Sequence, residues 1–186
     1  MKNKALQGDC LELMKDIEDK SIDMILCDLP YGTTACKWDT IIPFEPLWEQ
    51  YKRIIKDNGA IVLTASQPFT SALVMSNPDM FKYEWIWDKN KGSNIMLVKK
   101  QPLKVHENIL VFGGSSYFPQ MTEGEPYRQR GSHNVNRTDG AITPKGAIKY
   151  SKDFDSSKRY PVSIQYFSNH REKEQIFHKT KKPVAL

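Results

Sequence analysis

Asp28, Leu29, Pro30 and Tyr31 are the residues with the clearest capacity for chemistry, and they directly follow an apolar run. An aromatic amine is a poor nucleophile because its lone pair is delocalised into the ring. The Asp28 carboxylate and the Leu29 carbonyl could accept its two protons and draw the nitrogen toward a tetrahedral, reactive form. Pro30 would fix the turn that aims this carbonyl, and the Tyr31 ring could stack on a base. The alternative is a structural turn that packs Tyr31 against the core.

Hydrophobic spacing predicts the elements that position this motif. The segment 21–28 is typical of a buried parallel strand that ends in an acid. An amphipathic stripe predicts a helix over 43–57 that ends at Asn58-Gly59. The remaining expected elements are a strand at 5–8, a short helix capped by Asp9, a strand at 60–64 and a helix at 68–76. This alternation indicates a parallel α/β sheet. Ligands bind such sheets at the carboxyl ends of strands, where Asp28 and the segment 64–67 lie.

The second half of the sequence has a different pattern of predicted elements. Strands are predicted at 81–88 and 107–112, with a basic, irregular segment at 89–105 between them. From 113 to about 163 no helical or strand period appears, and so long a loop is uncommon unless it has a function. We therefore expect a catalytic half at 1–112, an insertion that contacts a partner at 113–170, and a further segment at 171–186.

Charge and composition narrow the class of protein. Residues 1–114 carry 14 Lys and Arg against 15 Asp and Glu, whereas 115–171 carry nine against five. The basic excess of the later half suits a surface that contacts nucleic acid, although a solvated basic face would look the same. The three cysteines and four histidines show no ligand spacing, so neither a metal site nor a disulfide framework is expected. No membrane span or signal peptide is evident, and we expect a cytoplasmic protein.

Four segments together resemble the permuted, or β-class, DNA amino-methyltransferases. Gly8-Asp9-Cys10 is similar to the opening Gly-Asp segment of that family, and Asp28-Leu29-Pro30-Tyr31 to its catalytic Asp-Pro-Pro-Tyr motif. The segments 85–89 and 105–112 are similar to its middle strands and their His-Glu pair, His106-Glu107. The segment 177–186 is similar to its closing His-Pro-Thr-Gln-Lys-Pro stretch. The order of the four makes the resemblance specific.

The resemblance implies a Rossmann-like S-adenosylmethionine-dependent methyltransferase sheet in permuted order, incomplete at the C-terminus. Leu29 replaces the first proline of the motif, but its carbonyl is still available. The glycine-rich cofactor motif of the family would follow Pro183, and the sequence given ends at Leu186. Phe112-Gly113-Gly114 is interpreted as a turn. The resemblance assigns S-adenosylmethionine to Asp9, Cys10, Asp28, His178, Thr180, Lys182 and Pro183. A homodimer or a complementing C-terminal polypeptide could complete that site.

The insertion is the expected contact with double-stranded DNA. Arginine and asparagine suit guanine and adenine edges, so the candidate DNA-binding residues are Arg128, Arg130, Asn134, Asn136 and Arg137. Trp38 is a looser candidate for closing over a flipped base. His106 and Glu107 are expected to be structural.

The function implied is methyl transfer from S-adenosylmethionine to adenine N6 in a specific duplex site, with the base flipped out. The aspartate at the first motif position favours adenine over cytosine N4 by resemblance. The alternatives are a non-catalytic DNA-binding remnant and a cytosine-N4 methyltransferase. Base specificity and a restriction partner are not readable from the sequence.

Overall fold

The computed structural model of the chain describes residues 3–114, 117–126 and 157–167. Among these, 3–114 and 163–167 belong to one compact unit, and 117–126 with 157–162 belong to a second. The described part of the second unit contains a short antiparallel ladder of β5 (Thr122–Glu123) and β6 (Lys158–Arg159). The division expected at 112 and 170 stays a prediction.

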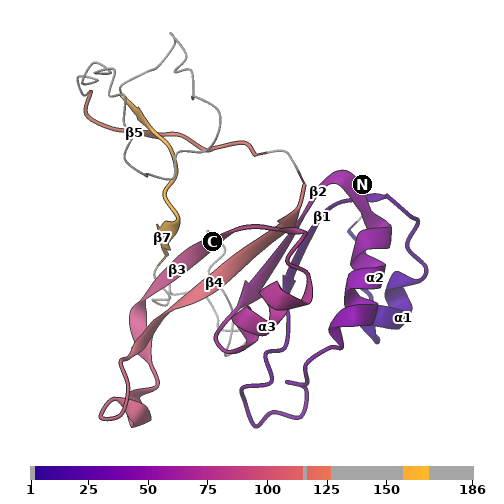
Figure 1. The fold of residues 1–186 in the computed structure, drawn as a ribbon, viewed down its shortest axis with the longest axis horizontal. Helices are drawn as coiled ribbons and strands as arrows, with labels where there is room; N and C mark the ends of the chain where they lie inside the picture. The colour runs from indigo at the N-terminus through magenta and orange to yellow at the C-terminus, as the bar shows by residue number, and fades with distance from the viewer. Residues whose placement is uncertain (1–2, 115–116, 127–156, 168–186) are drawn as a thin grey trace, which may run out of the picture. The chain divides into compact units, whose positions relative to one another are not determined.

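The first unit is built on a five-stranded mixed sheet (Figure 1). Its order is β1-β2-β4-β3-β7. The strands are β1 (Ile22–Asp28), β2 (Ile55–Ala65), β3 (Phe81–Ser93), β4 (Lys104–Gly113) and β7 (Ile164–Tyr166). Only the β1–β2 and β3–β7 pairs are parallel. The α/β class is confirmed, and β1 and β2, the strands from which a parallel sheet was expected, do pair in parallel, but the sheet as a whole is mixed. The chain returns from β3 to β4 as a hairpin, which places β4 antiparallel between β2 and β3.

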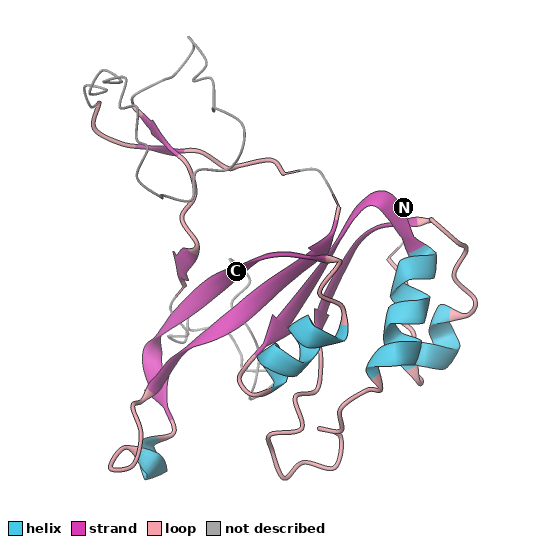
Figure 2. Cartoon of the chain, viewed as in Figure 1, coloured by secondary structure: helices cyan, strands magenta, loops and turns pink. Residues whose placement is uncertain are grey.

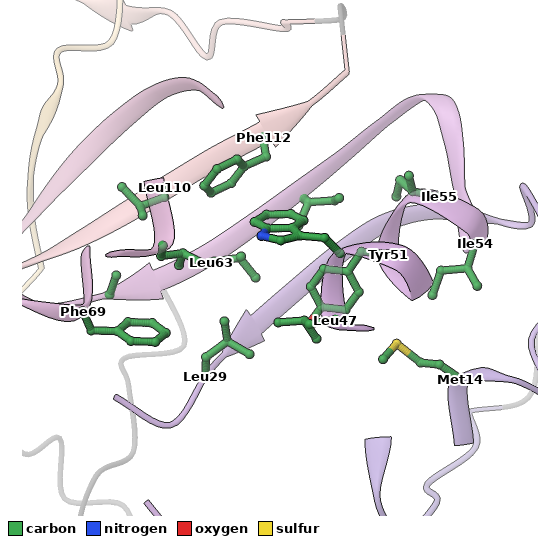
Figure 3. Close-up of a cluster of buried hydrophobic side chains, with 14 residues drawn as sticks. Met14, Leu29, Leu47, Tyr51, Ile54, Ile55, Leu63, Phe69, Leu110 and Phe112 are labelled. Carbon is green, nitrogen blue, oxygen red and sulfur yellow. The ribbon is translucent and has the colours of Figure 1, made fainter. Parts of the chain in front are cut away.

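Three short α-helices share one core with the sheet (Figures 2 and 3). They are α1 (Cys10–Met14), α2 (Phe44–Ile54) and α3 (Phe69–Ser76). The predicted apolar stripe of α2 is real, since Leu47, Trp48 and Tyr51 are all buried. They pack against alternating strand residues such as Leu63 and Phe112. Alternation puts such residues on one face of the sheet. On β1, Met24 and Leu26 are 53% and 69% exposed.

The predicted helix over 43–57 ends three residues early. Ile55 is already extended (φ −73°, ψ 139°) and pairs with Ile22, so β2 begins where α2 ends. Asn58-Gly59 therefore lies in a strand and does not cap a helix. Gly59 allows a close approach of two strands, because a Cβ there would lie 2.9 Å from the Asp23 carbonyl oxygen. Local turn signals did not reveal this approach.

Two further local expectations have clear outcomes. The strand expected at 5–8 was wrong, because these residues form neither helix nor strand. Gly113 and Gly114 both have positive φ, which fits the turn expected at the end of β4. None of the helices in the described part of the chain is both long and apolar enough to span a bilayer.

Candidate active site

Asp28 is the last residue of β1, at the carboxyl end of that strand. Its neighbour in register on β2 is Thr64, which is 5% exposed. The Thr64 hydroxyl donates a short hydrogen bond to Asp28 Oδ1. A buried hydroxyl on one parallel strand thus holds the carboxylate of the next, on the edge where sheets of this kind bind ligands.

Tyr31 closes this cluster from the loop that follows β1. Its hydroxyl lies 2.9 Å from both Asp28 Oδ1 and Thr64 Oγ1, so its single proton can be donated to either. Burial raises the pKa of Tyr31 well above its ordinary value, and the negative charges of Asp28 and Glu107 raise it further against the opposing hydrogen bond of Thr64. Tyr31 is therefore a neutral donor and a ring surface near neutral pH.

The ring of Tyr31 packs against the hydrophobic core. It stacks on Phe69 of α3 with centroids 5.4 Å apart and an interplanar angle of 27°. Leu29, one step before the proline, is 5% exposed and belongs to the same core (Figure 3). The turn between Asp28 and Tyr31 is consequently fixed by apolar packing at both ends. The structural and the chemical interpretations of the motif are thus compatible.

The loop after Tyr31 is anchored by a buried carboxylate that the sequence did not single out. Asp39 accepts hydrogen bonds from the backbone N–H groups of Gly32, Thr33 and Thr34, at 2.7–2.9 Å. The Thr34 hydroxyl donates a fourth, at 2.7 Å. These bonds, the Thr34 hydroxyl first, lower the pKa of Asp39 to about 2 against an opposing effect of burial. Trp38 beside it is 61% exposed, and its proposed closure over a base stays a prediction.

The opening segment contains the start of α1. Asp9 caps α1, accepting a hydrogen bond from the Leu11 N–H at 2.8 Å. Burial raises the pKa of the Cys27 thiol, a hydrogen bond with Tyr51 lowers it, and both Cys10 and Asp28 add to the rise. Of the expected cofactor residues, Asp9 and Cys10 are exposed, and their role in cofactor binding stays a prediction.

A buried ion pair joins β3 and β4. Lys89 of β3 and Glu107 of β4 approach to 3.0 Å, with side chains only 11% and 18% exposed. Lys104 at the start of β4 contacts the Ser66 hydroxyl just past β2. The structural role expected for Glu107 fits this ion pair, whereas His106 is exposed.

The remaining expected site residues fall outside the described part of the chain. They comprise all the DNA-contact candidates and the closing segment: Arg128, Arg130, Asn134, Asn136, Arg137, His178, Thr180, Lys182 and Pro183. Their roles stay predictions. Within the described residues, no group of three His, Cys, Asp or Glu side chains could hold a metal ion.

Sequence reasoning placed Thr64 at the ligand-binding edge but gave it no role, and it missed Asp39 and Phe69. The pairing of Thr64 with Asp28 depends on the register of two strands, which no local pattern specifies. A signal for Asp39 was present, since the segment 32–34 offers small, polar turn residues to a nearby carboxylate. Two surface hollows, of about 530 and 220 Å³, are lined by other residues. The chemistry is therefore assigned from the geometry around Asp28.

Comparison with known proteins finds similarity to methyltransferases. No family model matches the chain. It is 25% identical over 197 residues to the type II methyltransferase M1.MboII of Moraxella bovis, with 97% of this chain and 72% of that protein covered.

Among solved structures, the chain resembles PvuII DNA methyltransferase, which is cytosine-N4-specific, with a TM-score of 0.51 and 13% identity. That match covers 90% of this chain and 58% of the other, and it concerns the fold. The M1.HpyAVI complex with S-adenosylmethionine matches with a TM-score of 0.43 and 19% identity, over 66% of this chain and 61% of the other. The chain thus spans about three fifths of the length of these solved proteins.

Proposed function

Because the chain is similar in sequence to the type II methyltransferase M1.MboII and in fold to PvuII DNA methyltransferase, we propose that it belongs to the DNA N6-adenine and N4-cytosine methyltransferases and carries the catalytic half of a methyl transfer from S-adenosylmethionine to adenine N6 in duplex DNA. The observation that carries the proposal is the cluster of Asp28, Thr64 and Tyr31 at the carboxyl ends of β1 and β2. The cluster places a carboxylate that can accept a hydrogen bond from an amine next to an aromatic ring that can stack on a base.

Each residue of the cluster has a distinct task. Asp28 accepts one N–H of the amine and takes up the proton that the nitrogen loses, while the Leu29 carbonyl accepts the other N–H. Thr64 keeps the carboxylate in place, because its own buried hydroxyl is committed to Oδ1. Tyr31 offers one ring face to the flipped base, and the other face rests on Phe69.

The cofactor residues that the structure describes fit such a site. Asp9 and Cys10 are exposed, as residues that contact a cofactor must be. S-adenosylmethionine, when bound, supplies the methyl group as an electrophile on a positively charged sulfur. Asp9 and Cys10 would hold it, and Asp28 would orient the amine toward it.

The choice of adenine rests on the aspartate at the first position of the motif. Cytosine N4 presents a similar amine, and PvuII DNA methyltransferase acts on cytosine. The alternatives are therefore a cytosine-N4 enzyme and a chain that binds DNA without catalysis.

The test is to incubate the purified chain with unmethylated duplex DNA and radiolabelled S-adenosylmethionine, alone and with a complementing polypeptide that carries only the C-terminal part of a longer relative. The labelled nucleosides are then identified by mass spectrometry. N6-methyladenine supports the proposal. N4-methylcytosine would show that the target base is cytosine and not adenine. DNA binding with no label in either mixture would favour the non-catalytic alternative.

A further inference from the structure

The hairpin of β3 and β4 carries an exposed tip beyond its regular pairing. The ladder is continuous from Trp85 to Asp88 and then shifts register before Ser93 pairs with Lys104. Between them lies the 3-10 turn η1 (Ile95–Leu97), entered through Asn94 in the left-handed region. Figure 1 shows this end of the hairpin projecting from the sheet. The segment 91–103 is called the hairpin tip below.

The apolar side chains of the hairpin tip are uncovered. Met96 is 98% exposed, Ile95 71% and Val98 52%, and the three lie within four consecutive residues. Contiguous exposed apolar side chains of this kind mark contact sites more often than isolated ones do.

The hairpin tip is basic. Residues 91–103 contain three lysines and no acidic residue, and Lys89 and Lys104 flank this segment. Lys89 is neutralised by Glu107 and Lys104 contacts Ser66. Lys91, Lys99 and Lys100 are exposed, and none of them forms an ion pair with a carboxylate in the described residues.

The hairpin tip extends from the edge of the sheet that holds Asp28. Lys104 at its base contacts Ser66, which follows Thr64 by two residues, and Thr64 bonds to Asp28. A duplex that delivered a base to Asp28 would bring its phosphates and its neighbouring base pairs to this edge.

We propose that the hairpin tip is a second DNA-contacting element, distinct from the insertion at 113–170. Lys99 and Lys100 bind backbone phosphates, and Ile95 and Met96 pack against the base steps beside the displaced nucleotide. Apolar wedges flanked by cations act in this way in proteins that unstack DNA. The inference rests on the proposed function, since it takes DNA as the substrate. An apolar, basic segment also suits an anionic membrane surface, but its place at the same end of the sheet as Asp28 favours DNA.

The proposed phosphate contacts of the tip lysines are tested by measuring how duplex binding by the full chain depends on salt concentration. Each phosphate contact contributes about 0.9 to the slope of log K against log salt, so Lys99→Gln with Lys100→Gln should lower the slope by about 1.8. Lys52→Gln with Lys82→Gln is the matched control, since both lysines are exposed and lie on α2 and at the start of β3, away from the hairpin tip. An unchanged slope in the first pair, or an equal loss in the control, would overturn the proposal.

The apolar contact is tested by Met96→Ser. Its burial on DNA predicts roughly tenfold weaker binding at any one salt concentration, with an unchanged slope. Vesicles of phosphatidylcholine and phosphatidylglycerol are sedimented in parallel. Vesicle binding that depends on Met96, with DNA binding unaffected, would assign the tip to a membrane. A wild-type chain that binds no DNA would overturn the proposed function as well, whereas normal DNA binding by both tip variants overturns this inference alone.

Discussion

The substitution Thr64→Val tests whether Thr64 positions the Asp28 carboxylate, and it leaves the other groups of the site in place. Valine keeps the shape of threonine and removes only the hydroxyl. That hydroxyl is buried and bonds to Asp28 Oδ1, and it also lies 2.9 Å from the Tyr31 hydroxyl. The variant therefore leaves the core intact and removes one of the two hydroxyl groups that hold Asp28 Oδ1, the other being that of Tyr31.

The magnitude follows from the type of hydrogen bond. A bond to a charged group contributes about 1.5–3 kcal/mol. Asp28 itself is exposed, so water replaces part of the loss, and about 1–2 kcal/mol is expected to reach the transition state. That corresponds to a fall in kcat of roughly 5- to 30-fold. KM for DNA and for S-adenosylmethionine should change little, because Thr64 contacts neither.

The assay is the initial rate of label transfer to duplex DNA, measured for wild type, Thr64→Val and Thr64→Ser. Serine keeps the hydroxyl and should recover most of the rate. If valine and wild type have equal kcat, or if serine is as slow as valine, Thr64 does not position Asp28 and the reasoning is wrong.

Three further predictions concern the ring, the loop and the core. Tyr31→Phe keeps the stacking surface and should retain methyl transfer within about fivefold, whereas Tyr31→Ala should lose more than about tenfold; equal losses in the two variants would contradict the stacking role. The lowered pKa of Asp39 means that its stabilisation is present above the unfolded value of about 3.9 and is lost as the pH falls toward about 2. The Tm difference between wild type and Asp39→Asn should therefore be largest near neutral pH and shrink between those values, and a constant difference would rule out this linkage. Leu63→Ala removes a fully buried side chain and should lower the free energy of unfolding by about 2–5 kcal/mol in urea titrations; a loss below about 1 kcal/mol would mean that the core tolerates the cavity.

Much of the first unit was predictable from local pattern. The apolar run before Asp28, the acid that caps α1 and the stripe on α2 all identify elements that the structure contains. These signals depend on neighbours within a few residues, which a sequence displays directly.

The rest depends on which strands pair. The insertion of β4 between β2 and β3 turns an expected parallel sheet into a mixed one. The same pairing brings Lys104 to Ser66 across the sheet. The early end of α2 likewise follows from the pairing of Ile55 with Ile22, and no helix-stop signal records it.

The most direct test of the central claim compares Asp28→Ala with wild type in label transfer from S-adenosylmethionine to duplex DNA, with DNA binding measured on the same samples. The account predicts that the variant binds DNA as wild type does and transfers no label to adenine. Undiminished transfer by Asp28→Ala would show that the carboxylate does not hold the amine and would contradict the assignment of this site.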